Sequence, residues 1–162
     1  MAIRYLKITL ILLVALQALI YAIQNVVNID ATYQSIAYVI SNQDHQAYPF
    51  SVGPDVTNPI FIWITLAIVL TCEFSAGIIS TLGAYHMWQN RQATSHEFNS
   101  AKHYAIIGCL VSMVTWFGLF MVVAAAYFQM WQTAIGDSSY KGAFMIFTAS
   151  ALILVVVSQT DD

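Results

Sequence analysis

The sequence predicts an all-α membrane protein, built as an antiparallel bundle of four transmembrane helices. Two features of composition indicate this: 59% of the 162 residues are hydrophobic and only 8% are charged, whereas soluble domains carry about a quarter charged residues. The third observation is four long apolar runs of the kind that cross the ~30 Å hydrocarbon core of a bilayer. Because the runs take up most of the chain, we expect a single domain over residues 1–162.

The first span is predicted at residues 8–27. Arg4 and Lys7 precede it, as basic residues precede the apolar core of a signal peptide. This core is about 20 residues long, however, whereas that of a signal peptide has about 7–15, and no small-residue cleavage site follows it. We therefore expect the segment to remain as an anchor. The other spans are predicted at residues 60–88, 104–131 and 143–157.

The basic residues predict the orientation. Arg4 and Lys7 precede the first span, Arg91 and Lys102 lie between the second and third, and only Lys141 falls elsewhere. Since cytoplasmic loops carry the excess of Lys and Arg, both termini should be cytoplasmic. The segment 28–59 and a short turn at residues 136–139 should then lie outside.

The outer segment 28–59 contains a pattern typical of an amphipathic helix. Apolar residues recur at helical spacing from Tyr33 to Ile40, with polar residues on the other side. This predicts a short helix on the membrane surface or on the outer end of the bundle. An irregular loop with all three prolines follows, and the segment could be a lid or a surface that binds a partner. The candidate contact residues are Asp30, Tyr33, Ile36, Asp44 and Tyr48.

Glu73 is a carboxyl group near the expected middle of the membrane. An ionised side chain there costs roughly 2.5–3.5 kcal/mol on insertion scales. We therefore expect Glu73 to face the interior of the bundle and to keep its proton. The residues on its helical stripe are small, so that another helix can approach closely. They are Gly77, Ser80 and Ala84, and Gly108 belongs to a comparable stripe on the third span.

The other three spans bring hydrogen-bonding side chains to about the depth of Glu73. These are Gln17, Ser112, Thr115 and Ser150. We expect one intramembrane polar cluster, in which Glu73 donates a hydrogen bond to Gln17 or to a hydroxyl group. Such a cluster can be structural, with about 0.6–2 kcal/mol for each interhelical bond, or it can mark a proton or ion path. The lack of a second ionisable group at this depth favours the structural interpretation.

Several classes of function find little support in the sequence. His86 and His103 have similar depths and could clasp a haem, but solvated histidines at the membrane interface explain them more simply. No Cys and His spacing predicts a metal site, and no motif assembles a catalytic nucleophile, base and oxyanion hole. A net charge of −3 without a basic patch disfavours nucleic-acid binding. We expect no enzymatic activity and no cofactor.

Distinct segments carry a resemblance to a known family. They are Glu73 with Gly77, Gly83-Ala84, MWQNRQA from Met87, FNSAKHYAIIG from Phe98, TWFGLFM from Thr115, YFQMWQ from Tyr127 and GAFMIF from Gly142, with a looser match around Asn25, Val39 and Ser41. In these segments the chain resembles a bacterial domain-of-unknown-function family of small four-span integral membrane proteins. The resemblance implies a multi-pass protein of the bacterial cytoplasmic membrane, and it implies no chemistry.

The chain departs from this family at two places. The acidic and aromatic stretch after the first span is eroded, and Ala124-Ala125-Ala126 stands where the family has two glycines and a polar residue. An activity of the family that depends on those positions would be missing here.

The function we expect first is non-enzymatic binding of a membrane partner through the spans and the outer segment. The protein would be an accessory subunit of a complex, or an immunity-type protein that blocks a membrane-inserting toxin. The alternatives are a small proton-linked carrier or channel centred on Glu73 and, with less support, a haem-binding redox anchor. Association into a homo-oligomer is left open.

Overall fold

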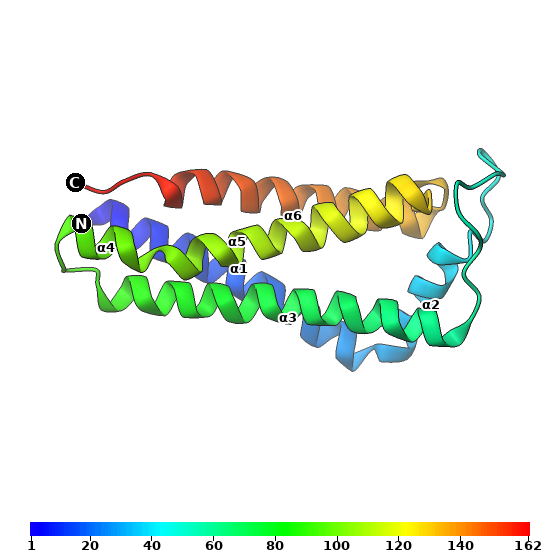
Figure 1. Ribbon diagram of the computed structural model, residues 1–162, viewed down its shortest axis with the longest axis horizontal. Helices are drawn as coiled ribbons and strands as arrows, with labels where there is room; N and C mark the ends of the chain where they lie inside the picture. Colours follow the sequence, from blue (N-terminus) through cyan, green and yellow to red (C-terminus); the bar gives the residue numbers. More distant parts are fainter.

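Four long helices run lengthwise through an elongated bundle in the computed structural model of residues 1–162 (Figure 1). Three of them are α1 (Ala2–Val27), α3 (Pro59–Gln89) and α6 (Ala134–Ser158). The fourth consists of α5 (His103–Met113), continued by η1 (Val114–Tyr127). All four are long and apolar enough to cross a membrane, and the chain has no strand. The predicted fold class is confirmed.

Three short elements complete the chain: α2 (Ile29–Ile40), α4 (Ser95–Ala101) and η2 (Met130–Gln132). Both termini and α4 lie at one end of the bundle, which we call the terminal end (Figure 1). The loop of residues 41–58 and the turn around η2 lie at the other, which we call the loop end. The helix predicted in the segment 28–59 is α2.

The start of α6 corrects one prediction. Residues 136–139 are not a turn but part of the first turns of α6, because Thr133 caps the helix and accepts a hydrogen bond from the Gly136 amide at 3.1 Å. Asp137 is also favourable in this first turn, next to the positive end of the helix dipole. The chain reverses earlier, at residues 128–133, where Gln129 has a φ of 54°.

The second half of the third span has an unusual winding. From Val114 to Tyr127 the backbone is a π-helix of 14 residues, and the amide of Phe128 after it bonds the carbonyl of Val123 at 3.0 Å. This geometry normally occurs as a single turn inside an α-helix. Hydrophobic periodicity predicts a helix at residues 104–131 but does not reveal how it is wound.

The antiparallel register between α1 and α3 determines what lies opposite Glu73. At the terminal end, Arg4 donates to the carbonyl of Arg91 at 3.2 Å, and further along Gly77 packs directly on Leu19. In this register, α1 ends opposite the middle of α3. The half of α3 nearer the loop end is covered by α2, whose Tyr33 ring lies 4.9 Å from that of Trp63.

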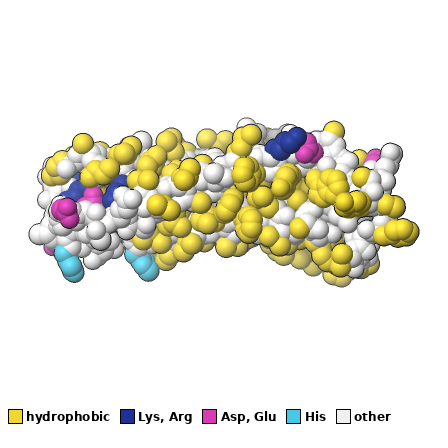
Figure 2. All heavy atoms as spheres, turned by 90° about the horizontal axis from the view of Figure 1, so that it is seen from above, with side chains coloured by type: hydrophobic (Ala, Val, Ile, Leu, Met, Phe, Trp, Pro, Cys, Tyr) yellow, Lys and Arg dark blue, Asp and Glu magenta, His cyan; other side chains and the backbone are white.

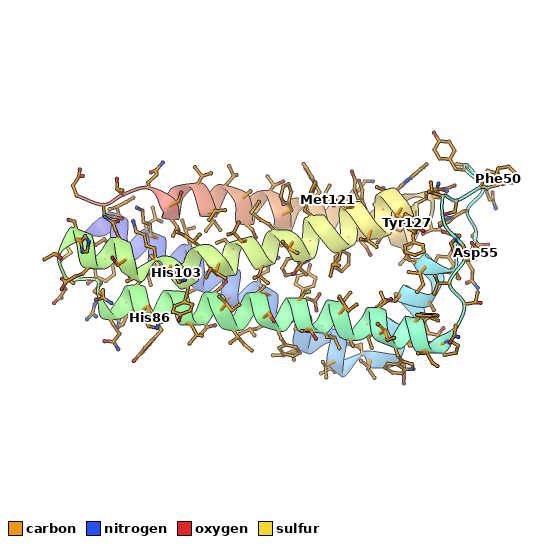
Figure 3. All side chains as sticks on the ribbon, in the orientation of Figure 1. Phe50, Asp55, His86, His103, Met121 and Tyr127 are labelled. Carbon is orange, nitrogen blue, oxygen red and sulfur yellow. The ribbon has the colours of Figure 1, made fainter.

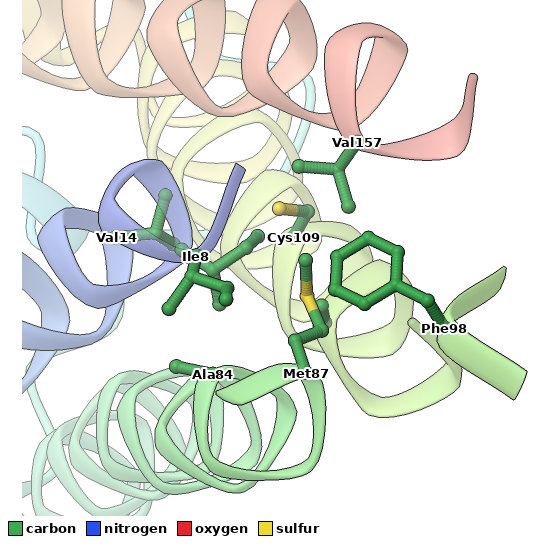
Figure 4. Close-up of a cluster of buried hydrophobic side chains, with 9 residues drawn as sticks. Ile8, Val14, Ala84, Met87, Phe98, Cys109 and Val157 are labelled. Carbon is green, nitrogen blue, oxygen red and sulfur yellow. The ribbon is translucent and has the colours of Figure 1, made fainter. Parts of the chain in front are cut away.

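Two apolar clusters fill the interior. The first lies at the terminal end and joins all four spans around Phe98 and Met87 (Figure 4). The second is centred on Trp116, with Ala18, Ala76, Ala143 and Ile146. Many alanines in these clusters let the backbones approach closely, as is typical of helix packing in membranes.

Candidate functional site

Glu73 is buried in the bundle, with 1% of its surface exposed. Its partner is Asn25, whose side-chain amide donates to the two carboxyl oxygens at 3.1 and 2.9 Å. Asn25 lies in the last turn of α1 and Glu73 in the middle of α3. The contact therefore links the end of one membrane helix to the centre of the next.

The other expected members of the polar cluster do not gather around Glu73. Gln17 is half-buried and does not hydrogen bond to Glu73, whose side chain bonds Asn25. Ser112 and Ser150 form a separate buried pair, with their hydroxyl oxygens 2.8 Å apart. The Thr115 hydroxyl donates to the Val111 carbonyl of its own helix at 2.8 Å. The expected cluster is therefore replaced by two separate contacts, Glu73 with Asn25 and Ser112 with Ser150.

The sequence does not predict Asn25 as the partner, because residues at equal distances from the span ends lie side by side only if the first and second spans share a centre. In the observed register, residue 25 is opposite residue 73, although it is almost at the end of its own helix. One pattern in the sequence could have revealed Asn25: Ala15, Ala18 and Ala22 recur at helical spacing and make a small-residue stripe on α1. All three alanines are buried in the structure. That stripe ends on Asn25, and a stripe of this kind is expected to pack against another helix.

The expected packing face serves two neighbours. Gly77 faces α1, because a Cβ atom there would lie 2.5 Å from Leu19 Cγ. Ser80 faces α5, where a Cβ atom on Gly108 would lie 2.3 Å from Ser80 Oγ. Ala84 belongs to the apolar cluster at the terminal end. Gly83 makes an equally close contact, since its Cβ atom would lie 2.4 Å from the backbone nitrogen of Ala105.

A second group of polar residues lies at the terminal end, where Lys7 and Lys102 are each only 2% exposed. Lys7 Nζ donates to Asp161 Oδ2 and to the carbonyl of Gln159, both at 2.7 Å. Lys102 Nζ donates to the same two oxygens and to Asn99 Oδ1. We call this group of Lys7, Asn99, Lys102, Gln159 and Asp161 the terminal latch.

Asn99 holds the backbone of the latch. Its side-chain amide donates to the Asp161 carbonyl at 3.1 Å, and its oxygen accepts from the Asp161 amide at 3.0 Å. Beside the latch, Arg4 donates to the carbonyl of Ala93 at 2.7 Å and lies over the ring of Phe98. The tail after α6 is thereby fastened to α1 and to the start of the third span. Figure 2 shows basic and acidic side chains gathered at this end.

The two lysines of the latch change the pKa of the Asp161 carboxyl group. Burial alone would raise the pKa of this carboxyl, but hydrogen bonds from Lys102 and Lys7 outweigh burial and lower it. From the sequence, Lys7 and Lys102 predict only the orientation of the chain in the membrane. An acidic pair at residues 161–162 after an apolar helix was the one available sign that a carboxylate could reach them.

At the loop end, residues 48–52 form a projecting segment that we call the loop-end tip. The Tyr48 amide donates to Gln132 Oε1 at 2.7 Å, and Gln132 Nε2 donates back to the Tyr48 carbonyl at 3.2 Å. The Tyr48 ring meets Trp131 edge-on, with centroids 5.4 Å apart. Yet Phe50 and Val52 are 88% and 87% exposed, and Figure 3 shows Phe50 at the far edge of this end.

The other expected contact residues of the outer segment have separate places. Asp30 is exposed in the first turn of α2, and Ile36 is half-buried on it. Asp44 accepts a hydrogen bond from the Tyr38 hydroxyl at 2.9 Å. Between α2 and the starts of α3 and α6 lies a cavity of about 400 Å³. Gln34, Tyr38, Ser41, Thr57, Ile62 and Ile135 are among the residues that line it.

The two histidines considered for haem lie on the outside of the bundle. His86 and His103 are both exposed, and the His86 ring packs at 5.2 Å from that of Tyr104 (Figure 3). No group of three or more His, Cys, Asp or Glu side chains is placed to hold a metal ion. The main polar groupings are Glu73 with Asn25, the Ser112 and Ser150 pair, the terminal latch and the loop end.

Comparison with known proteins places the chain in a family by sequence. No curated protein and no solved structure matches it. A family model described as "Predicted small integral membrane protein (DUF2165)" matches residues 3–160. Four apolar helices agree with that description. The chain belongs to this family of small integral membrane proteins.

Proposed function

We propose that this protein binds a partner protein on the outer side of the membrane through the loop-end tip. The observation that carries the proposal is that the tip is braced by hydrogen bonds while its apolar side chains, Phe50 and Val52, face away from the bundle. Gly53 adds to the bracing, since a Cβ atom there would lie 1.8 Å from the hydroxyl of Tyr127.

The energetics of the tip favour this role. Fixing a residue in one backbone conformation costs about 1–2 kcal/mol, and an exposed phenylalanine gains nothing from burial within its own chain. A fixed loop with a large apolar side chain at its apex lowers the ordering cost of binding, because the loop is already in place when the partner arrives. Aromatic side chains are also enriched among the residues that dominate binding energy.

The proposed location is the bacterial cytoplasmic membrane, with the terminal end in the cytoplasm and the loop-end tip outside. Arg4, Lys7, Arg91 and Lys102 support this orientation, since all four belong to the terminal end. Two kinds of partner fit a tip on the outer face. One is a subunit of a membrane complex, and the other is a membrane-inserting toxin that the protein would block.

The experiment uses a photo-crosslinking amino acid at position 50 in living cells. A partner that binds the tip gives one discrete adduct with a second protein. Gln132→Ala, which removes both hydrogen bonds to Tyr48, should weaken the adduct without removing the apolar side chains. Position 144 on α6 is the matched control, because Phe144 is exposed on a membrane helix far from the tip. A lack of any protein adduct specific to position 50 would refute the proposal.

The identity of the partner separates the two variants. An accessory subunit should yield a membrane protein adduct in unstressed cells. An immunity-type protein should yield an adduct only when the toxin is added, and cells without this protein should then die. Survival of such cells on exposure to toxin would exclude the second variant.

A second candidate function is a small proton-linked carrier or channel centred on Glu73. The observation that favours it is a carboxyl group held inside the membrane by one amide, that of Asn25. Protein reconstituted in vesicles with a pH-sensitive dye provides the test. Proton flux that is lost in Glu73→Gln but kept in Asp137→Asn would support a carrier, and equal flux in both variants and in empty vesicles would exclude it.

A further inference from the structure

The terminal latch contains an unusual arrangement of charge. Two ammonium groups, from Lys7 and Lys102, converge on a single carboxylate oxygen, Asp161 Oδ2. The remaining acceptors around them, the Gln159 carbonyl and the Asn99 side chain, are neutral. The two positive charges are thus balanced by one negative charge in a place almost closed to water. An uncompensated buried charge is costly, so an anion beside the two ammonium groups stabilises them.

Asp161 is an imperfect occupant of this position. Its second carboxylate oxygen, Oδ1, is buried and has no hydrogen-bond partner, which is unfavourable because this acceptor has lost its bonds to water. The residues on either side, Thr160 and Asp162, are exposed, so the Asp161 carboxylate is the one charged group that the tail places between the lysines. A ligand whose acceptor oxygens all receive hydrogen bonds would compete well with the Asp161 side chain for the place between the two lysines.

The surroundings indicate where such an anion comes from. Lys7 lies one turn from the start of α1, and Tyr5 and Trp88, whose rings meet at 6.0 Å, mark the same level. Aromatic side chains of this kind favour the headgroup layer of the bilayer. Basic pockets between membrane helices at this level suit lipid headgroups, and Arg4 adds a further positive charge nearby.

We propose that Lys7 and Lys102 form a binding site for a phosphate monoanion, which the Asp161 carboxylate occupies as a tethered substitute. The phosphate belongs to the headgroup of an anionic lipid in the leaflet at the terminal end, or is free phosphate, and both present the same oxygens to the lysines. When phosphate enters, Asp161 leaves and the tail after Ser158 is released from Asn99. The site is thus a phosphate-dependent lock on the end of α6.

The test compares lipid binding to the purified full-length protein and its variants by native mass spectrometry. Asp161→Asn removes the tethered anion and should increase bound phosphatidylglycerol several-fold. Phosphatidylcholine, which has the same phosphate but no net charge, should stay at the wild-type level. Asp162→Asn is the matched control, because this neighbouring carboxylate is exposed and outside the latch. Added inorganic phosphate that displaces the lipid would show that the site takes free phosphate as well.

A second measurement does not depend on the folding of any charge variant. A spin label at position 160 of the otherwise wild-type protein reports the mobility of the tail. Phosphatidylglycerol should increase this mobility, whereas phosphatidylcholine should leave it unchanged. Equal binding of phosphatidylglycerol by wild type and Asp161→Asn, or a tail that stays immobile with the anionic lipid, would overturn the proposal.

Discussion

Asn25 lies opposite Glu73 although the two residues occupy different positions in their helices, one in the last turn of α1 and the other in the middle of α3. The amide is the hydrogen-bond partner of the buried carboxyl group in this structure. The two side chains therefore act as a unit, in which removal of one member leaves the other without its bond.

Asn25→Leu should destabilise the protein by about 1–3 kcal/mol, because it leaves a buried carboxyl group unsatisfied. Glu73→Leu should be tolerated or mildly stabilising, and the double variant should be close to wild type. Thermal unfolding in detergent, analysed as a double-mutant cycle, measures the coupling between them. Additive effects of the two substitutions would contradict a direct bond.

Gly83→Ala should lower the melting temperature clearly, whereas Gly142→Ala should not. The added methyl group at position 83 would lie 2.4 Å from a backbone nitrogen that cannot move aside, but at position 142 it meets no atom within 4 Å. Both substitutions make the same chemical change in a membrane helix. Equal melting temperatures for the two variants would disprove the close approach of α3 and α5.

Ser150→Ala should cost roughly 0.6–1.7 kcal/mol, between the average and the largest value typical of hydrogen bonds between membrane helices. The lost bond is the one to the Ser112 hydroxyl. A variant with alanine at both positions should cost no more than the single one, because it leaves no hydroxyl without a partner. Unfolding in detergent can check this order. A double variant much less stable than either single one would show that each hydroxyl has another partner.

Acid should open the terminal latch. The pKa of Asp161 is lowered in the latched state and returns to its ordinary value, 3.8, when the tail is released. The stabilisation is therefore complete above that ordinary value and is lost as the pH falls through the lowered one. Hydrogen exchange of residues 159–162 against pH measures the opening. Asp161→Asn should exchange rapidly at every pH, and a tail that stays protected in strong acid would contradict the role of this carboxylate.

The orientation of the chain can be tested with single cysteines in a variant without Cys72 and Cys109. A cysteine at position 52 should react with a membrane-impermeant thiol reagent in intact cells, because Val52 is exposed at the loop end. A cysteine at position 92, in the turn at the terminal end, should react only after the cells are opened. The reverse pattern would place both termini outside.

Much of the fold could be predicted from the sequence because membranes impose a simple rule on helix length and polarity. The four spans and α2 follow from apolar runs and helical spacing. The π-helical winding of η1 could not be predicted, since it leaves the composition unchanged. The sequence places the turn before α6 too far along the chain. Gly136, Asp137 and two serines resemble a turn, but here they belong to a helix that is capped by Thr133.

The candidate site was predictable only in part. Burial of Glu73 follows from the cost of a carboxyl group in lipid, but its partner depends on the register between α1 and α3, which the positions of the spans alone do not determine. The terminal latch depends on a contact between residues 7, 102 and 161, which are far apart in the chain. Nothing in the local pattern around Lys7 or Lys102 distinguishes a buried lysine from an interfacial one.

The early end of α1 has a consequence for the surrounding lipid. Beside the half of α3 nearer the loop end lies α2, whose exposed side bears Asp30, Gln34 and Ser35. On its own exposed side, α3 bears Ile60, Phe61 and Ile64 in the same half. Acyl chains can cover the apolar side of α3 along its whole length, but they cannot cover the polar side of α2. We therefore expect the bilayer to thin beside α2 relative to α3, so that the lipid surface around the protein would be uneven.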